Sequence, residues 1–443
     1  MKVSLCKGKF RGIFNPAKCA FDDILLIALS WCFACDISRR VKSRERANCV
    51  SQQIKHVGVV GLGVMGFDIA FLYAMKGFRT LAYDAAKPAM HALIDRREQT
   101  IDRLKKRNRI SDGEIDNLRS LLVPADGLAA LAHADLITEA VSENAKTKLA
   151  VYNALREASF TGLLTTNTSS VTRATLLKDN AVDPKTFALT HFFNPVLYTQ
   201  MVEVVTGDMD AAHCETILSF LKTLGRRPVA TQDISGFVSN GILMVYAVMA
   251  VHLLECGALI EQVDQAAKEL KLLPPFISFD SWKPSIVEDV TRIMFELRGD
   301  QFLRSSALLA RLAKDNPRFY AEQKANSKIY QLAGTLGRNL DDETIKRALK
   351  TSMLVAAARV VELGESPATV DFVATEGIKM PQAPLKEIDA VGVPAVIADL
   401  AKTNQTLGDK PLSVPKLLAA MAGEKQTFYE NDRANPWLVS RRK

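Results

Sequence analysis

A glycine-rich turn between a short apolar strand and a helix constrains the fold of this chain more than any other feature. The residues Val57-Gly-Val-Val lead into Gly61-Leu-Gly63-Val-Met-Gly66, and a helix is predicted over 64–76. In such a turn the first glycine permits the sharp bend, the second lets a ligand approach the backbone, and the third lets the helix pack closely on the strand. A phosphate group then lies at the positive end of the helix dipole. The sequence therefore predicts a nucleotide-binding βαβ unit here.

An acidic residue after the second strand indicates which nucleotide binds. A strand predicted at 78–84 ends in Asp84, about 20 residues after the turn, where a carboxylate binds the ribose 2′-hydroxyl of NAD. The same carboxylate repels the 2′-phosphate of NADP, so we expect NAD as the cofactor. A glycine turn without any ligand is the alternative interpretation. The residues expected to hold the cofactor are Gly61, Gly63, Met65, Gly66 and Asp84.

A histidine and a glutamate on two later apolar segments are the candidate catalytic groups. Strands are predicted at 187–192, which contains His191, and at 201–205, which contains Glu203. On neighbouring strands an imidazole and a carboxylate can form a general base and its orienting partner, and histidine suits this task near neutral pH. A histidine on an apolar strand is more often a core residue. The catalytic interpretation therefore depends on the cofactor turn upstream.

The order of predicted elements indicates the fold class. From residue 56 to 233 strands alternate with helices, which is typical of an α/β protein with a Rossmann-type, doubly wound and mostly parallel sheet. After Asp233 the strand signals stop, and the remaining chain is predicted to be helical, with a charged connector near 303–340.

The helical region contains a weak internal repeat. Glu255-Cys-Gly257 recurs as Glu362-Leu-Gly364, and Val263-Asp264 recurs at the same spacing as Val370-Asp371. Such a repeat indicates two related helical domains, although chance recurrence of helix-end residues is the alternative. The predicted domains are an N-terminal extension over 1–51, an NAD-binding domain over 52–233, a first helical domain with its connector over 234–335, and a second helical domain over 336–443.

The N-terminal extension differs from the rest of the chain in composition. It is basic and holds Cys6, Cys19, Cys32, Cys35 and Cys49. We expect it to be poorly structured or a targeting segment, because no thioredoxin-like context or further zinc ligands surround its Cys-x-x-Cys spacing. With few cysteines beyond it, the body of the protein needs no disulfides, which is typical of a reducing compartment. We expect the cytoplasm, with the mitochondrial matrix as the alternative.

Composition excludes several kinds of partner. The net charge of +8 comes without a basic face interleaved with aromatic residues, so we expect no nucleic-acid partner. No apolar run approaches the roughly 18–20 residues that span a bilayer, and we expect no membrane span. We also expect no metal site.

Six separated motifs resemble the L-3-hydroxyacyl-CoA dehydrogenase family, in the family's order and approximate spacing. The resemblance covers about residues 54–430. The tandem helical region resembles that of the multifunctional fatty-acid oxidation subunit, but without that protein's hydratase module. The motifs are Gly-Leu-Gly-Val-Met-Gly at 61–66, Asp-Leu-Ile-Thr-Glu-Ala-Val-Ser-Glu-Asn at 135–144, Asn-Thr-Ser-Ser at 167–170, His-Phe-Phe-Asn-Pro at 191–195, Met-Val-Glu-Val-Val at 201–205 and Asp-Ile-Ser-Gly-Phe-Val-Ser-Asn at 233–240.

The resemblance implies a reaction and residue roles. The reaction is NAD-dependent oxidation of the 3-hydroxyl of an L-3-hydroxyacyl-CoA to a 3-ketoacyl-CoA, as in fatty-acid β-oxidation. His191 would take the hydroxyl proton, and Glu203 would fix the imidazole tautomer. The other implied roles are holding the reacting oxygen for Ser169 and Asn240, shaping the substrate pocket for Asn194, and lining the nicotinamide side for Glu143 and Lys148.

Two other functions and two assembly states stay open at this point. A β-hydroxyacid dehydrogenase acting on a free hydroxy acid uses a similar glycine turn, although its catalytic lysine is not found here. A non-catalytic NAD-binding homologue is the second alternative. The family's default is a homodimer formed through the helical region, whereas the duplicated helical half could cover that surface within a monomer.

Overall fold

The protein is described here by a computed structural model, which defines residues 53–178, 181–322, 324–334, 340–408 and 411–440. The chain divides into two units, residues 1–50 and 51–443, and all described residues belong to the second. The extension predicted over 1–51, with its cysteines, lies outside the described residues.

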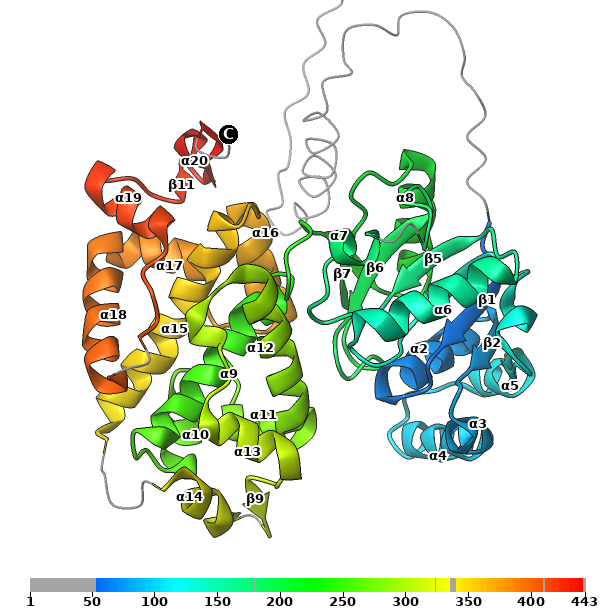
Figure 1. Cartoon of the computed structure of the whole chain (residues 1–443), viewed down its shortest axis with the longest axis horizontal. Coiled ribbons are helices and arrows are strands. Elements are labelled where there is room, and N and C mark those ends of the chain that lie inside the picture. Colours follow the sequence, from blue (N-terminus) through cyan, green and yellow to red (C-terminus); the bar gives the residue numbers. More distant parts are fainter. Residues whose placement is uncertain (1–52, 179–180, 323, 335–339, 409–410, 441–443) are drawn as a thin grey trace, which may run out of the picture. The chain divides into compact units, whose positions relative to one another are not determined.

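An eight-stranded sheet organises the first part of this unit (Figure 1). Its order is β3-β2-β1-β4-β5-β6-β7-β8, and every pairing is parallel except that of β6 with β7. The expected doubly wound, mostly parallel sheet is therefore confirmed. The strands are β1 (His56–Val60), β2 (Arg79–Tyr83), β3 (Leu122–Pro124), β4 (Leu136–Glu139), β5 (Leu163–Thr166), β6 (Phe187–Phe192), β7 (Met201–Val205) and β8 (Arg227–Ala230).

Helices cover both faces of this sheet, because successive strand residues point to opposite sides. On β1, Val57 and Val59 enter one apolar core and Val60 enters the other. The first core takes its helical residues from α2 (Val64–Met75), α4 (Leu93–Lys105), α5 (Asp112–Leu121) and α8 (Ala211–Thr223). The second takes them from the short helices η2 (Leu128–Leu131) and α7 (Arg173–Leu176) and from α6 (Ala145–Glu157).

Some elements of this part were not predicted from the sequence. The charged segment over 87–107 contains two helices, α3 (Lys87–His91) and α4; α3 buries no residue, whereas α4 directs Leu93 into the core. Helix α5 and strand β3 were not predicted either. Helix α5 begins with a capping box in which Ser111 and Glu114 bond each other's backbone, a recognisable signal. Strand β3 has only three residues and lies at the sheet edge.

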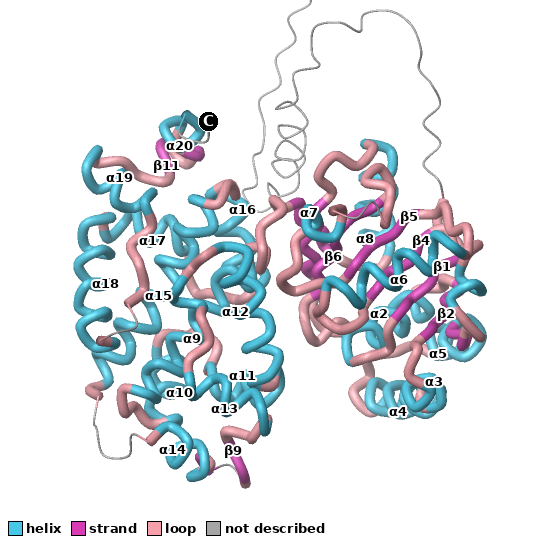
Figure 2. The backbone as a smooth tube through the Cα atoms, in the orientation of Figure 1, coloured by secondary structure: helices cyan, strands magenta, loops and turns pink. Residues whose placement is uncertain are grey.

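The second part of the unit is helical, as Figure 2 shows. One apolar core runs through all of it and includes residues of both α9 and α15. The expectation that strands end after Asp233 was wrong, since two short antiparallel pairs occur. The elements are α9 (Ser239–Glu255), α10 (Ile260–Glu269), α11 (Pro275–Trp282), α12 (Pro284–Arg298), η3 (Gln301–Leu303), α13 (Ala307–Asp315), β9 (Tyr320–Ala321), β10 (Lys324–Ala325), α14 (Ser327–Ala333), α15 (Asp342–Glu362), α16 (Pro367–Phe372), the π-helical turn η4 (Val373–Gly377), α17 (Pro384–Val391), α18 (Val393–Leu407), α19 (Lys416–Glu424), β11 (Tyr429–Glu430), β12 (Arg433–Ala434) and α20 (Pro436–Ser440).

A hydrogen-bond network occurs twice in this helical region. Asp264 accepts from the Phe276 backbone and the Tyr320 hydroxyl at 2.8 Å each, and Asp371 accepts from the Leu385 backbone at 2.8 Å. The Tyr429 hydroxyl completes the second copy with a 2.7 Å bond to Asp371. Burial raises the pKa of both aspartates despite these donors. The matching contacts support two related helical copies, and the limits of each domain stay a prediction.

Candidate active site

The carboxyl ends of four parallel strands carry the candidate site. Strands β1, β4, β5 and β6 run in the same direction, so the segments that follow them meet at one edge of the sheet. These segments contain the glycine turn after β1, Glu143 after β4 and Ser169 after β5, and His191 lies near the end of β6. The topology therefore brings the cofactor turn and the candidate base to the same side of the sheet.

Two glycines of the cofactor turn are required by the backbone, and the third lies open. Gly61 has φ of +92°, and a Cβ atom at Gly66 would lie 1.8 Å from the Gly61 carbonyl oxygen. Gly63 is exposed, and a Cβ atom there would meet nothing within 4 Å. Met65 is partly exposed beside it at the start of α2. A narrow turn with open backbone at the middle glycine fits the close approach of a pyrophosphate.

Asp84 lies directly beside this turn. Its Oδ2 accepts from the Leu62 backbone N–H at 2.6 Å, and its Oδ1 accepts from the Ala86 backbone N–H at 2.8 Å. Each carboxylate oxygen has two lone pairs, so both can accept a further bond from a ribose hydroxyl. The residues at the turn thus fit a dinucleotide with a free 2′-hydroxyl.

Arg96 contacts the glycine turn and was not predicted from the sequence. Its guanidinium donates to the Leu62 carbonyl at 2.6 Å and to the Gly63 carbonyl at 3.2 Å. It also lies over the Phe67 ring, 4.0 Å from the centroid. Because Arg96 is on α4, far from the turn in sequence, no local pattern could have identified it.

His191 and Glu203 form a buried pair across two strands. They are register partners in the antiparallel β6–β7 ladder, and His191 Nδ1 lies 2.9 Å from Glu203 Oε2. Glu203 is fully buried and His191 is 7% exposed. A neutral imidazole that donates from Nδ1 keeps Nε2 as an acceptor. The Phe237 ring stacks on the imidazole at 4.8 Å between centroids and fixes its plane.

The first turn of α9 supplies the other donors to Glu203. The Val238 and Ser239 backbone N–H groups donate to Glu203 Oε1 at 3.0 and 3.1 Å. The Ser239 hydroxyl donates to Oε2 at 2.5 Å. An acidic group at a helix N-terminus is stabilised by the helix dipole. Ser239 was not among the residues predicted from the sequence, although it directly precedes Asn240.

Asn240 links the helical region to the segment after β5. Its amide Nδ2 donates to the Ser169 carbonyl at 3.1 Å and lies 3.5 Å from His191 Nε2. Ser169 is partly exposed, and its hydroxyl has no hydrogen-bond partner among the residues that the structure describes. The structure thus brings His191, Glu203, Ser169 and Asn240 together.

Glu143 organises the turn that carries Ser169. Its Oε1 accepts from the Thr168 hydroxyl at 2.6 Å and from the Ser169 and Ser170 backbone N–H groups at 2.8 and 2.7 Å. Burial alone would raise the pKa of Glu143, but the charge of Lys148 and these hydrogen bonds hold it below the ordinary value. Glu143 therefore acts on the site through this turn.

Lys148 and Asn194 lie apart from the His191 group. Lys148 is fully buried, and its Nζ bonds Glu139 Oε1 at 2.9 Å and the Thr166 hydroxyl at 3.3 Å. Asn194 is exposed in the loop after β6. Neither residue hydrogen-bonds to His191 in the described part of the chain. The buried Glu139, which also accepts from the Tyr152 hydroxyl at 2.8 Å, was not anticipated.

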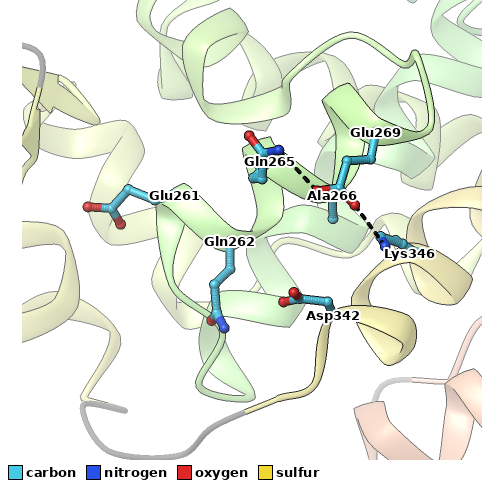
Figure 3. A pocket seen from close by; sticks show the side chains of 7 residues that line it. All are labelled: Glu261, Gln262, Gln265, Ala266, Glu269, Asp342 and Lys346. Atoms are coloured by element: carbon cyan, nitrogen blue, oxygen red, sulfur yellow. Dashed lines mark hydrogen bonds and ion pairs between the residues drawn. The ribbon is translucent and has the colours of Figure 1, made fainter.

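A pocket in the helical region is lined mainly by acidic and amide side chains and one lysine. Figure 3 shows it between α10 and the start of α15, where Lys346 bonds Glu269 at 2.7 Å. None of its lining residues belongs to the sheet. Across the described ranges, no group of three or more His, Cys, Asp and Glu side chains could hold a metal ion, and no helix has both the length and the apolar character to cross a membrane.

Comparison with known proteins agrees with this geometry. Residues 56–234 match the NAD-binding domain of 3-hydroxyacyl-CoA dehydrogenase, and residues 236–331 match the C-terminal domain of that family. The mitochondrial hydroxyacyl-coenzyme A dehydrogenase of Mus musculus is 33% identical over 224 residues, which are 48% of this chain and 71% of that protein.

Two further likenesses extend over most of the chain. The fatty acid oxidation complex subunit alpha of Pseudomonas entomophila is 25% identical over 432 residues, which are 89% of this chain and 58% of that longer protein. The crystal structure of 3-hydroxybutyryl-CoA dehydrogenase from Escherichia coli has the same fold, with a TM-score of 0.69 at 22% identity over 84% of this chain and 99% of that one. The chain belongs to the 3-hydroxyacyl-CoA dehydrogenase family.

Proposed function

We propose that this protein oxidises the 3-hydroxyl of an L-3-hydroxyacyl-CoA to the 3-ketoacyl-CoA, with NAD as the hydride acceptor, in fatty-acid β-oxidation. One observation carries the proposal. An imidazole whose Nδ1 is fixed by the fully buried Glu203 lies 3.5 Å from the Asn240 amide, at the sheet edge that bears the glycine turn. A secondary alcohol needs such a base for its proton and such donors for its oxygen.

Each residue has a defined task in this proposal. His191 Nε2 takes the proton of the 3-hydroxyl, and Glu203 stabilises the imidazolium that forms. The Asn240 amide and the Ser169 hydroxyl hold the oxygen as it becomes a carbonyl. NAD, when bound, accepts the hydride from C3. Glu143 keeps Ser169 in place through the backbone of residues 168–170.

The remaining site residues follow from their positions. The glycine turn and Asp84 hold the cofactor, and the Asp84 carboxylate favours NAD over NADP. Lys148 supports the nicotinamide side from within, through its ion pair with Glu139. Asn194 is a substrate contact at the loop that follows β6.

Assembly and location form a further part of the proposal. The protein is either a monomer, in which the second helical copy covers the surface of the first, or a homodimer through the helical region; sedimentation at several concentrations separates the two. It acts in a reducing compartment, either the cytoplasm or the mitochondrial matrix. The mouse relative is named mitochondrial, which supports the matrix.

A substrate panel tests the proposed reaction. NADH formation is measured with L-3-hydroxybutyryl-CoA and longer homologues, with the D-isomers and the free hydroxy acids as matched controls. We expect turnover of the L-thioesters alone. Turnover of a free acid but not of its thioester would instead assign the β-hydroxyacid dehydrogenase activity. NAD binding without turnover on any chain length would make the protein a non-catalytic homologue.

A further inference from the structure

The Ser239 hydroxyl shares one carboxylate oxygen with the catalytic imidazole. It lies 2.5 Å from Glu203 Oε2 and 3.5 Å from His191 Nδ1, and Ser239 is 2% exposed. Oε2 also faces His191 Nδ1 at 2.9 Å. Both side-chain donors therefore bond to the same carboxylate oxygen, which can accept both, and they do so where Glu203 and Ser239 are almost fully buried and electrostatic interactions are stronger than in solution.

We propose that Ser239 is a positioning residue that lowers the affinity of the His191–Glu203 pair for its proton and so keeps the base available at lower pH. This inference rests on the proposed function of that pair. When His191 is neutral, Glu203 is a full carboxylate beside a neutral ring and gains most from the hydroxyl donor. When His191 is protonated, the imidazolium already offsets much of that charge, so the same donor stabilises less. Ser239 therefore favours the proton-free pair.

Three uncharged groups and one further carboxylate lie near the pair. The imidazole lies beside the rings of Phe193 and Phe237 and 3.5 Å from the Asn240 amide, none of which is charged. Glu365, in the segment after α15, is fully buried, and its pKa is raised by this burial and also by the charge of Glu203 nearby. Its Oε2 accepts from the Gln232 backbone at 2.7 Å, so it is held in place independently of Ser239.

Ser239 and the pair that it contacts belong to different parts of the fold. It is the first residue of α9, whereas His191 and Glu203 belong to the sheet. The hydroxyl reaches Glu203 only when the start of α9 is docked there. The proton affinity of the His191–Glu203 pair therefore depends on whether the start of α9 is docked against Glu203.

The test compares pH profiles of kcat/KM for the full chain. For Ser239→Ala we expect the acid limb to move to higher pH by about half to one unit, as is typical when one charge-assisted hydrogen bond is removed. Ser239→Thr keeps a hydroxyl and should stay near wild type, while Ser239→Cys, a weak donor, should fall between. Ser235→Ala is the matched control, because that buried hydroxyl donates to the Ser170 carbonyl at 2.7 Å and does not touch Glu203. Its acid limb should not move.

A second readout does not depend on turnover. The His191 ring is titrated by nitrogen-15 NMR of histidine-labelled protein, assigned with His191→Gln. Protonation should occur at higher pH in Ser239→Ala, or in Ser239→Cys if the alanine variant does not fold. If an active Ser239 variant shows neither a shift in the pH at which His191 is protonated nor a shift in the acid limb of kcat/KM, the proposed role of Ser239 is wrong. The proposed function would still stand. Absence of turnover in wild type would overturn the proposed function, while the NMR titration would still decide the role of Ser239.

Discussion

The three glycines of the cofactor turn make different demands on the backbone. Gly61 has a left-handed φ of +92°, Gly66 lies against the Gly61 carbonyl, and Gly63 has open space where a side chain would project. Two of them are therefore needed to form the turn, and one is needed to leave room for the cofactor.

Matched alanine substitutions should separate these roles. Gly66→Ala forces its Cβ against the Gly61 carbonyl and should lower the free energy of unfolding by about 1–3 kcal/mol. Gly63→Ala should change it by less than about 0.5 kcal/mol but should weaken NAD binding about tenfold or more. Urea unfolding and NAD titration by fluorescence measure both effects. Equal stability loss in the two variants would contradict this division.

Glu143 makes stability depend on pH in a defined direction. Its pKa lies below the ordinary 4.5, so its stabilising contribution is complete above pH 4.5 and disappears as the pH falls through the lower, folded-state value. Glu143→Gln keeps an acceptor but loses the charge. The variant should be less stable than wild type by about 2 kcal/mol at pH 7, and the gap should narrow at pH 4 and below. Urea unfolding at both pH values checks this, and a gap that stays constant would argue against it.

Part of the candidate site could be predicted from the sequence. His191 and Glu203 could be named from their positions on two short apolar strands, whereas Ser169 and Asn240 were named only through the resemblance of their motifs to the family. Arg96 and Ser239 could not be named, because their contacts depend on how α4 and α9 pack against the turn and the sheet. Lys148 was named, but its complete burial beside Glu139 was not foreseen.

At the scale of elements, each helical copy is closed by an aspartate that binds a later strand pair. Asp280 accepts from the Phe319 and Tyr320 backbone N–H groups at 2.6 and 3.1 Å. Asp389 accepts from the corresponding Phe428 and Tyr429 groups at 2.8 and 2.9 Å. The segment near 303–340, which was expected to be a connector, therefore supplies part of the hydrogen-bond network of the first copy.

Removal of either aspartate should have the same effect. Asp280→Ala and Asp389→Ala each leave two partly buried N–H groups without their acceptor, and each should lower the free energy of unfolding by about 2–3 kcal/mol. Asp432→Asn, at an exposed residue that pairs with Lys386 at 3.4 Å, is the control and should be nearly neutral, because asparagine also tolerates the left-handed φ of 59° at this position. Thermal and urea unfolding measure these effects. A large loss in only one copy would show that the two networks are not equivalent.

Strands β6 and β7 were predicted with their observed limits because each is a short apolar run that is buried throughout. The repeated strand pairs were missed because each strand has only two residues. The repeated sequence Phe-Tyr-x-x-x-x-Ala-Asn at 319–326 and 428–435 would have revealed them. The hydrogen bonds that Asp280 and Asp389 accept join segments about 40 residues apart, which no periodic pattern encodes.

At the scale of the whole molecule, the second helical copy contacts the sheet beside the candidate base. A Cβ atom at Gly377 would lie 2.8 Å from the Phe193 ring and 2.8 Å from the Met201 sulfur. Phe193 lies 5.4 Å from the His191 ring between centroids. An ion pair of 3.2 Å between Arg227 and Glu376 adds to the same contact. The second copy thus supports, through Phe193, the strand that carries the candidate base.

A larger residue at this contact should disturb catalysis more than cofactor binding. Gly377→Val places added atoms against the Phe193 ring, which lies beside His191, and we expect kcat/KM to fall about tenfold while NAD affinity stays unchanged, a cost of about 1.4 kcal/mol. Gly423→Ala, in α19 with nothing within 4 Å of the added Cβ, is the matched control and should keep full activity. Unchanged kinetics in Gly377→Val would show that Phe193 does not transmit the contact.

The most direct test of the whole account is single-turnover NADH formation from L-3-hydroxybutyryl-CoA by wild type and by His191→Gln at saturating NAD. Glutamine fills similar space but cannot take the proton. The account predicts rapid turnover in wild type and a rate lower by roughly 10²- to 10⁴-fold in the variant, with NAD binding retained. Equal rates in the two proteins would contradict the assignment of His191 as the base.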